Sequence, residues 1–141
     1  MWRKTYSQIY ADVSKSSIWQ VWCDVNNWAS WQMDLDYCKM EGEFRAGNFF
    51  KLKPKGGQEF KVTLIEVEPQ VKFKDCTRFW GAKMYDTHEM HETEQGLRLI
   101  HTLEVTGPFK FLWIKLVAKN VAASIPAQLQ ALVAQARLNH E

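Results

Sequence analysis

The sequence has few cysteines and little net charge, and each shortage excludes a class of protein. Its 141 residues include only three cysteines, which are widely spaced and form no CxxC pair. We therefore expect reduced thiols in a cytoplasmic protein, and neither a disulfide framework nor a zinc knuckle. Lys and Arg number 18 against 16 Asp and Glu, so the formal net charge is only +2. This balance gives no electrostatic reason to expect nucleic acid or an anionic membrane as a partner.

Long apolar runs and familiar catalytic motifs are also missing. The first ten residues contain no apolar core of a signal peptide. Lys110, Lys115 and Lys119 interrupt the longest apolar stretch of the C-terminal half, so it cannot be an uninterrupted span of about 20 apolar residues. No HExxH motif, GxSxG motif or phosphate loop is present. We expect no integral membrane association and no cofactor.

What the sequence has in abundance is aromatic residues, including seven Trp and eight Phe. Its length predicts one domain over residues 1–141, large enough to bury a hydrophobic core without stabilisation by disulfides or metal ions. Alternating apolar and polar residues, with turn signals between them, predict seven strands. Their expected bounds are 3–11, 34–44, 48–53, 58–68, 71–79, 82–93 and 97–106.

Two short helices are expected between the first two strands, and one long helix at the C-terminal end. Ser16 or Ser17 is the predicted cap of the first short helix, and the second carries Trp28 and Trp31. Apolar residues at steps of three or four predict the long helix over 109–138, with a kink or break at Pro126. This order predicts an α+β fold in which a curved antiparallel sheet wraps around the long helix and leaves a cavity.

Several segments together resemble a known superfamily. They are the stretch from Val13 to Trp31, the Gly47 turn, Phe73-x-Asp75, His88-x-x-His91-Glu92, the Gly96 turn and Gly107-Pro108. This pattern resembles the START-like (SRPBCC) superfamily, in its polyketide cyclase/dehydrase and lipid-transport branch. The resemblance implies the helix-grip fold over essentially the whole chain. It does not select a function, because this superfamily includes cyclases, hydratases, lipid carriers and hormone receptors.

Histidines on the last two strands are the main candidates for chemistry. His88 and His91 lie three apart on one strand and should point to opposite faces, so we expect no metal site. A two-residue turn at Gln95-Gly96 would place His88 opposite Leu103 and Met90 opposite His101. Two imidazoles on this apolar face could bind a ligand oxygen or act as acid and base, although ordinary buried histidines are the commoner case.

The favoured hypothesis is binding of a small hydrophobic molecule, aromatic, polyketide-like or lipid-like, in the cavity. The first alternative is a cyclase or hydratase that uses His88, His101 or Asp75. The second is a protein-interaction module with a collapsed cavity. The sequence is also compatible with a homodimer. The expected ligand-binding residues are Trp28, Trp31, Met84, His88, Met90, His101, Leu103, Val117 and Val121.

Overall fold

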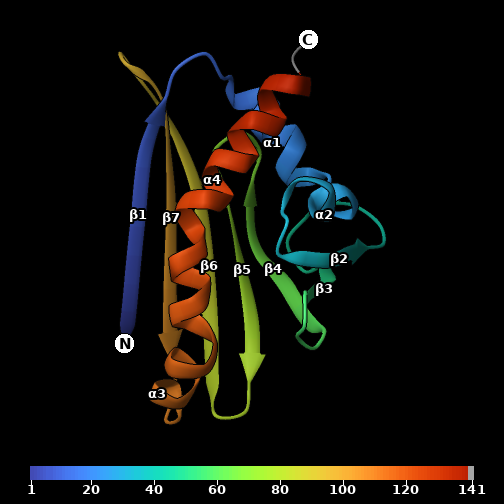
Figure 1. Cartoon of the computed structure of the whole chain (residues 1–141), viewed down its shortest axis with the longest axis vertical. Helices are drawn as coiled ribbons and strands as arrows, with labels where there is room; N and C mark the ends of the chain where they lie inside the picture. The colour runs from blue at the N-terminus through green and yellow to red at the C-terminus, as the bar shows by residue number, and fades with distance from the viewer. Residues whose placement is uncertain (140–141) are drawn as a thin grey trace.

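Seven antiparallel strands form one curved sheet in the computed structural model, which describes residues 1–139 (Figure 1). The strand order is β1-β7-β6-β5-β4-β3-β2, so all neighbours except β1 and β7 follow one another in the chain. The strands are β1 (Trp2–Tyr10), β2 (Leu35–Met40), β3 (Phe49–Pro54), β4 (Phe60–Glu68), β5 (Lys72–Phe79), β6 (Ala82–Thr93) and β7 (Gly96–Thr106). All seven predicted strands are therefore present.

Three short helical segments connect β1 to β2. They are α1 (Lys15–Cys23), the 3-10 turn η1 (Val25–Asn27) and α2 (Trp28–Trp31). The predicted cap at Ser16 or Ser17 is wrong, because the hydroxyl of Ser14 accepts the backbone N–H of Ser17 at 3.1 Å. Ser14 is in an extended conformation, which is usual for an N-cap residue. The helix therefore begins a few residues earlier than the apolar spacing alone indicates.

The C-terminal helical segment lies across one face of the sheet (Figure 1). It consists of α3 (Lys110–Trp113), a π-helical turn η2 (Ile114–Ala118) and α4 (Lys119–Asn139). Of the kink or break predicted at Pro126, the break is wrong, since α4 continues through this residue. The irregularity is instead at η2, where the helix is wound more loosely. No helix among residues 1–139 is both long and apolar enough to cross a membrane.

The register of the last hairpin differs from the predicted one by two residues. Glu94 and Gln95 form the turn, so that His88 pairs with His101 and Met90 with Leu99. The predicted partners, Leu103 for His88 and His101 for Met90, are therefore wrong. A shift of two keeps every side chain on its predicted face, because side chains alternate along a strand.

The buried side chains under the helix form two apolar clusters. The larger one joins α1 and the first strands to α4, and includes Trp22, Phe73 and Leu129. The smaller one lies between β6, β7 and η2, and includes Met84 and Ile114. Polar residues on β5, β6 and β7 lie on the same face of the sheet, and the site is built on them.

Candidate functional site

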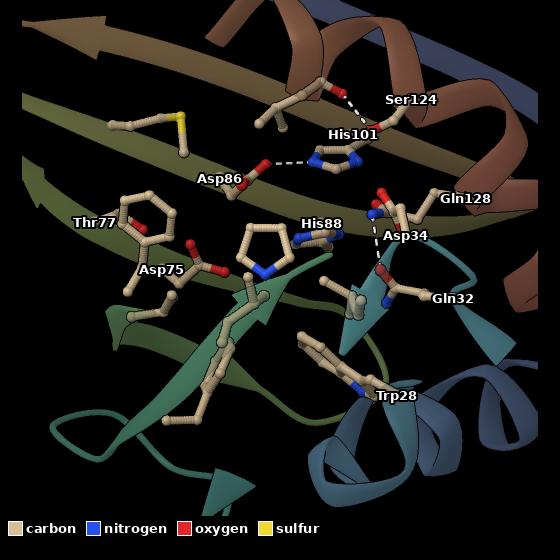
Figure 2. Close-up of a pocket in the computed structure, with 18 of the residues that line it drawn as sticks. Trp28, Gln32, Asp34, Asp75, Thr77, Asp86, His88, His101, Ser124 and Gln128 are labelled. Carbon is tan, nitrogen blue, oxygen red and sulfur yellow. Dashed lines mark hydrogen bonds and ion pairs between the residues drawn. The ribbon is translucent and has the colours of Figure 1, made fainter. Parts of the chain in front are cut away.

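A cavity of about 190 Å³ lies between the sheet, α2 and the helix α4. Its walls are mostly aromatic and aliphatic, and its polar side chains come from both the sheet and the helix (Figure 2). The lining includes Trp28, Trp31, Gln32, Phe50, Phe60, Phe73, Asp75, Thr77, Phe79, Met84, Asp86, His88, His101, Val117, Val121, Ser124, Gln128 and Leu129. Concave, mostly apolar sites with a few polar groups are typical of small-molecule binding.

A row of three rings crosses the sheet on one side of this cavity. Phe73, His88 and His101 are direct neighbours on β5, β6 and β7. The rings of Phe73 and His88 stack with centroids 4.3 Å apart, and those of His88 and His101 are 4.1 Å apart. The row follows from the register, because residues that face each other across antiparallel strands have neighbouring side chains. His88 is thus held between two rings.

A second row, one step along the same strands, carries two carboxyl groups. Asp75 on β5 lies directly opposite Asp86 on β6. Asp86 reaches diagonally to β7, where its Oδ1 accepts a hydrogen bond from Nε2 of His101 (Figure 2). The other ring nitrogen of His101, Nδ1, is buried and has no hydrogen-bond partner among the described residues. This buried nitrogen is therefore an unsatisfied polar atom within the cluster.

Burial and neighbouring charges set the protonation of this cluster. Burial, together with the nearby Asp86 charge, raises the pKa of Asp75 well above its usual range. Burial also opposes ionisation of Asp86, but attraction to His101 and the hydrogen bond outweigh it and lower the pKa of Asp86. Burial and His101 lower the pKa of His88 to about 3. The surroundings therefore favour the protonated form of Asp75 and the ionised form of Asp86, and His88 is neutral at neutral pH.

A second polar contact joins the helix to the segment after α2. Nε2 of Gln128 on α4 donates to Oε1 of Gln32 at 2.9 Å (Figure 2). Gln32 is buried, and both residues line the cavity. Trp28 lies beside them and donates its indole N–H to the carbonyl of Val21 at 3.1 Å. The amide pair therefore connects α4 to the end of α2.

Most of the predicted site residues lie in the cavity lining. These are Trp28, Trp31, Asp75, Met84, His88, His101, Val117 and Val121. Met90 and Leu103 do not line it; they are fully buried in the two apolar clusters. Their inward direction was predicted, but their positions along the strands place them away from the open space.

Sequence reasoning missed the amide pair and the hydroxyl groups of the site. Gln32 and Gln128 are 96 positions apart in the chain, so no local pattern connects them. Thr77 could have been found, because it is the next inward position after Phe73 and Asp75 on one strand. Asp86 lies on the face of His88 by strand alternation, but its bond to His101 depends on the register.

Asp86, His88 and His101 could also surround one divalent cation. Each offers one ligand atom, and these atoms lie within 4.8 Å of one another. An ion would have to replace the hydrogen bond between Asp86 and His101. His91, by contrast, is exposed on the other face, as its spacing predicted. The expected absence of a metal and of a cofactor stays a prediction.

Comparison with known proteins identifies the fold. No protein-family model matches the chain, and no curated protein matches its sequence. Solved structures do match. The di-domain ARO/CYC StfQ from the steffimycin biosynthetic pathway has a TM-score of 0.78 and 13% identity, over 98% of this chain and 51% of that one.

Two other solved structures match nearly the full chain. Norcoclaurine synthase from Thalictrum flavum, in complex with dopamine and hydroxybenzaldehyde, has a TM-score of 0.72 and 15% identity, over 99% of this chain and 89% of that one. Ara h 8.0201 has a TM-score of 0.72 and 8% identity, over 96% and 98%. Identities this low establish the architecture alone. The chain therefore has the helix-grip fold that its resemblance to the START-like superfamily implies.

Proposed function

We propose that the protein binds a small hydrophobic ligand in the cavity between the sheet and α4. The observation that carries this proposal is a cavity with apolar walls and with polar groups gathered on β5, β6 and β7. Two structural neighbours support it in a general way. One was solved with dopamine and hydroxybenzaldehyde, and the other is an ARO/CYC protein of a biosynthetic pathway. Both are similar to this chain in fold.

The size of the cavity narrows the class of ligand. Pockets for drug-sized molecules have volumes of about 300–1,000 Å³, and an apolar cavity of about 150 Å³ holds benzene. The cavity here, at about 190 Å³, therefore suits an aromatic molecule of one or two rings. A larger polyketide-like or lipid-like molecule would need the helix to move away from the sheet.

The polar cluster indicates which ligand groups would be recognised. Burial favours the protonated form of Asp75, which can donate a hydrogen bond, and the neutral ring of His88 offers one donor and one acceptor. Ligands with a carbonyl or hydroxyl group on an aromatic ring match this set. An anionic ligand would meet the negative charge of Asp86 at the same end, which disfavours carboxylates.

Titration calorimetry with para-hydroxybenzaldehyde, naphthol and a fatty acid tests this proposal. Met84→Trp should fill the cavity and weaken binding of the aromatic compounds, because Met84 lines the cavity and is buried. Met33→Trp is the matched control, since Met33 is 74% exposed and does not line the cavity. Thermal unfolding of both variants checks that the fold is intact. Equal binding by wild type and Met84→Trp would overturn the proposal.

An enzymatic function is the second candidate, and the bond between Asp86 and His101 favours it. A carboxylate that holds an imidazole is a common acid–base arrangement. In a cyclase or hydratase reaction, Asp75 would donate its proton to a ligand carbonyl oxygen. The pair of Asp86 and His101 would accept the proton released from the neighbouring carbon, giving an enol. We place this second because no substrate is indicated by the geometry.

The third hypothesis, a protein-interaction module with a collapsed cavity, has the least support. It requires a filled core under the helix, whereas open space separates α4 from the polar cluster. If no compound of the titration series shows saturable binding to the wild-type protein, this hypothesis would replace the proposal.

A further inference from the structure

Large apolar side chains are exposed together at one end of the molecule. They come from the turn between β5 and β6 and from the segment that begins the C-terminal helix, which lie at the same end of the sheet (Figure 1). We call these five residues the end patch. They are Trp80 (71% exposed), Phe109 (44%), Phe111 (74%), Leu112 (45%) and Leu116 (54%). A group of this kind usually marks a site of interaction with a protein or a membrane.

The two halves of the end patch are firmly joined. The backbone N–H of Phe109 donates to the carbonyl of Gly81 at 2.9 Å, and the indole N–H of Trp113 donates to the carbonyl of Trp80 at 2.7 Å. The rings of Trp80 and Phe109 are in contact, with centroids 4.4 Å apart. Gly81 permits this closeness, since its φ is +71° and a Cβ would lie 2.3 Å from the ring of Phe109. The exposed rings are thus held in place by the fold.

The segments that carry the end patch contain basic residues and no acidic ones. Residues 76–85 and 105–139 contain no Asp or Glu. Among their basic residues, Arg78, Lys83, Lys115 and Lys119 are exposed, and Lys110 is half-buried. Although the net charge of the chain is only +2, positive charge is therefore concentrated in the segments that carry the end patch.

The end patch also adjoins the cavity. The ring of Trp113 stacks on Phe79 with centroids 4.7 Å apart and an angle of 16° between the planes. Phe79 and Val117 both line the cavity, and Val117 directly follows Leu116 of the end patch. A surface that binds the end patch would therefore lie beside one wall of the cavity.

We propose that the end patch docks peripherally on an anionic lipid bilayer. Segments that lie in the membrane interface combine Trp, Phe and Leu on one side with Lys and Arg on the other, and basic residues attract anionic head groups. The end patch supplies the Trp, Phe and Leu, and the basic residues of the same segments supply the Lys and Arg. A second copy of the chain fits less well, because two such surfaces would bring like charges together. The inference goes beyond ligand binding and does not depend on it.

Co-flotation of the full chain with vesicles tests this inference. We expect binding to vesicles of phosphatidylcholine mixed with phosphatidylserine, and little binding to phosphatidylcholine alone. Phe111→Ser should lower the partition coefficient by about tenfold or more, because the exposed ring supplies apolar area to the interface. Lys115→Glu should also lower it by about tenfold or more, since each basic residue contributes about fivefold near an anionic surface.

Matched control variants distinguish binding through the end patch from nonspecific adsorption to vesicles. Met33→Ser removes an apolar side chain that is also 74% exposed, and Lys51→Glu reverses an exposed charge on β3. Both should bind vesicles as the wild type does. Equal binding to neutral and anionic vesicles, or equal loss in test and control variants, would overturn the inference. So would concentration-dependent dimerisation that Phe111→Ser abolishes. The affinity for naphthol, measured by titration calorimetry, should be the same in Phe111→Ser as in the wild type. Failure of the membrane inference can therefore be distinguished from failure of the ligand-binding proposal.

Discussion

Asp75 and Asp86 face each other directly across β5 and β6, yet the two carboxyl groups have opposite pKa shifts. The difference comes from their other neighbours. Asp86 is hydrogen-bonded to His101, which favours its ionised form, whereas burial and the charge of Asp86 favour the protonated form of Asp75. Two buried carboxylates at this spacing would repel each other strongly if both were ionised. The surroundings of the pair therefore favour a state in which only Asp86 is ionised.

Asp75→Asn should make folding less dependent on pH. Because the pKa of Asp75 is raised in the folded state, its favourable contribution is complete below about pH 4 and is lost as the pH rises through the raised value. Asn has a similar shape and does not titrate. The free energy of unfolding of the variant, relative to wild type, should therefore increase between about pH 4.5 and about pH 8. Urea unfolding of both proteins at the two pH values measures this free-energy difference. A difference that does not change with pH would contradict a raised pKa of Asp75 in the folded state.

His88→Gln should remove part of the acid sensitivity of the fold. The folded pKa of His88 is lowered to about 3, whereas the unfolded value is about 6.5. As the pH falls through this window, only the unfolded chain takes up the proton, so wild-type stability should fall by about 1.4 kcal/mol per pH unit from this group. His91→Gln is the control on the same strand, because His91 is exposed. If both variants lose stability in acid as the wild type does, His88 is not a buried neutral histidine.

Leu129→Ala should destabilise the protein by about 2–5 kcal/mol. Leu129 is 3% exposed and joins α4 to the larger apolar cluster, so truncation removes burial and leaves a void. Leu138→Ala, on the same helix, should change the free energy of unfolding by less than about 0.5 kcal/mol, since Leu138 is 66% exposed. Chemical denaturation of the two variants compares them. Similar values would mean that the contact between helix and sheet is not central to stability.

His101→Gln separates a carrier from an enzyme. The Gln amide can still donate to Asp86, so the buried carboxylate keeps a partner. For a carrier, affinity for naphthol should change by about 0.5–1.5 kcal/mol, the net value of one hydrogen bond. For an enzyme, turnover of an aromatic polyketide-like substrate should fall by about 10²–10⁴ while binding is retained. We expect the carrier outcome.

The order of the elements could be predicted from the sequence because their signals are local. The strand over 82–93 was predicted with the bounds that the structure shows, since its alternation is bounded by clear turn residues. The cap at Ser14 was missed because four polar residues precede the helix and any of three serines fits the pattern. A break at Pro126 does not occur, because the cost of this proline is tolerated inside a helix that packs well against the sheet.

The candidate site could be predicted only as a set of inward positions. His88 and His101 were placed on the correct face because an error of two residues in register preserves the alternation. Their direct contact, and the bond between Asp86 and His101, depend on which residues oppose each other, and this is decided by the turn at Glu94 and Gln95. The contact of Gln32 with Gln128 depends on how the helix crosses the sheet, which no local pattern encodes.

The π-helical turn η2 determines how the residues before it are rotated about the helix axis relative to those of α4. Ile114 and Ala118, within the turn, pack on the smaller apolar cluster, whereas Ile125 and Leu129 beyond it pack on the larger one. A π-turn holds one more residue than an α-helical turn needs. Loss of one residue here would rotate the preceding segment by about 100° relative to α4. The single extra residue of η2 therefore determines the direction in which the exposed end points, independently of the residues of α4 that cover the cavity.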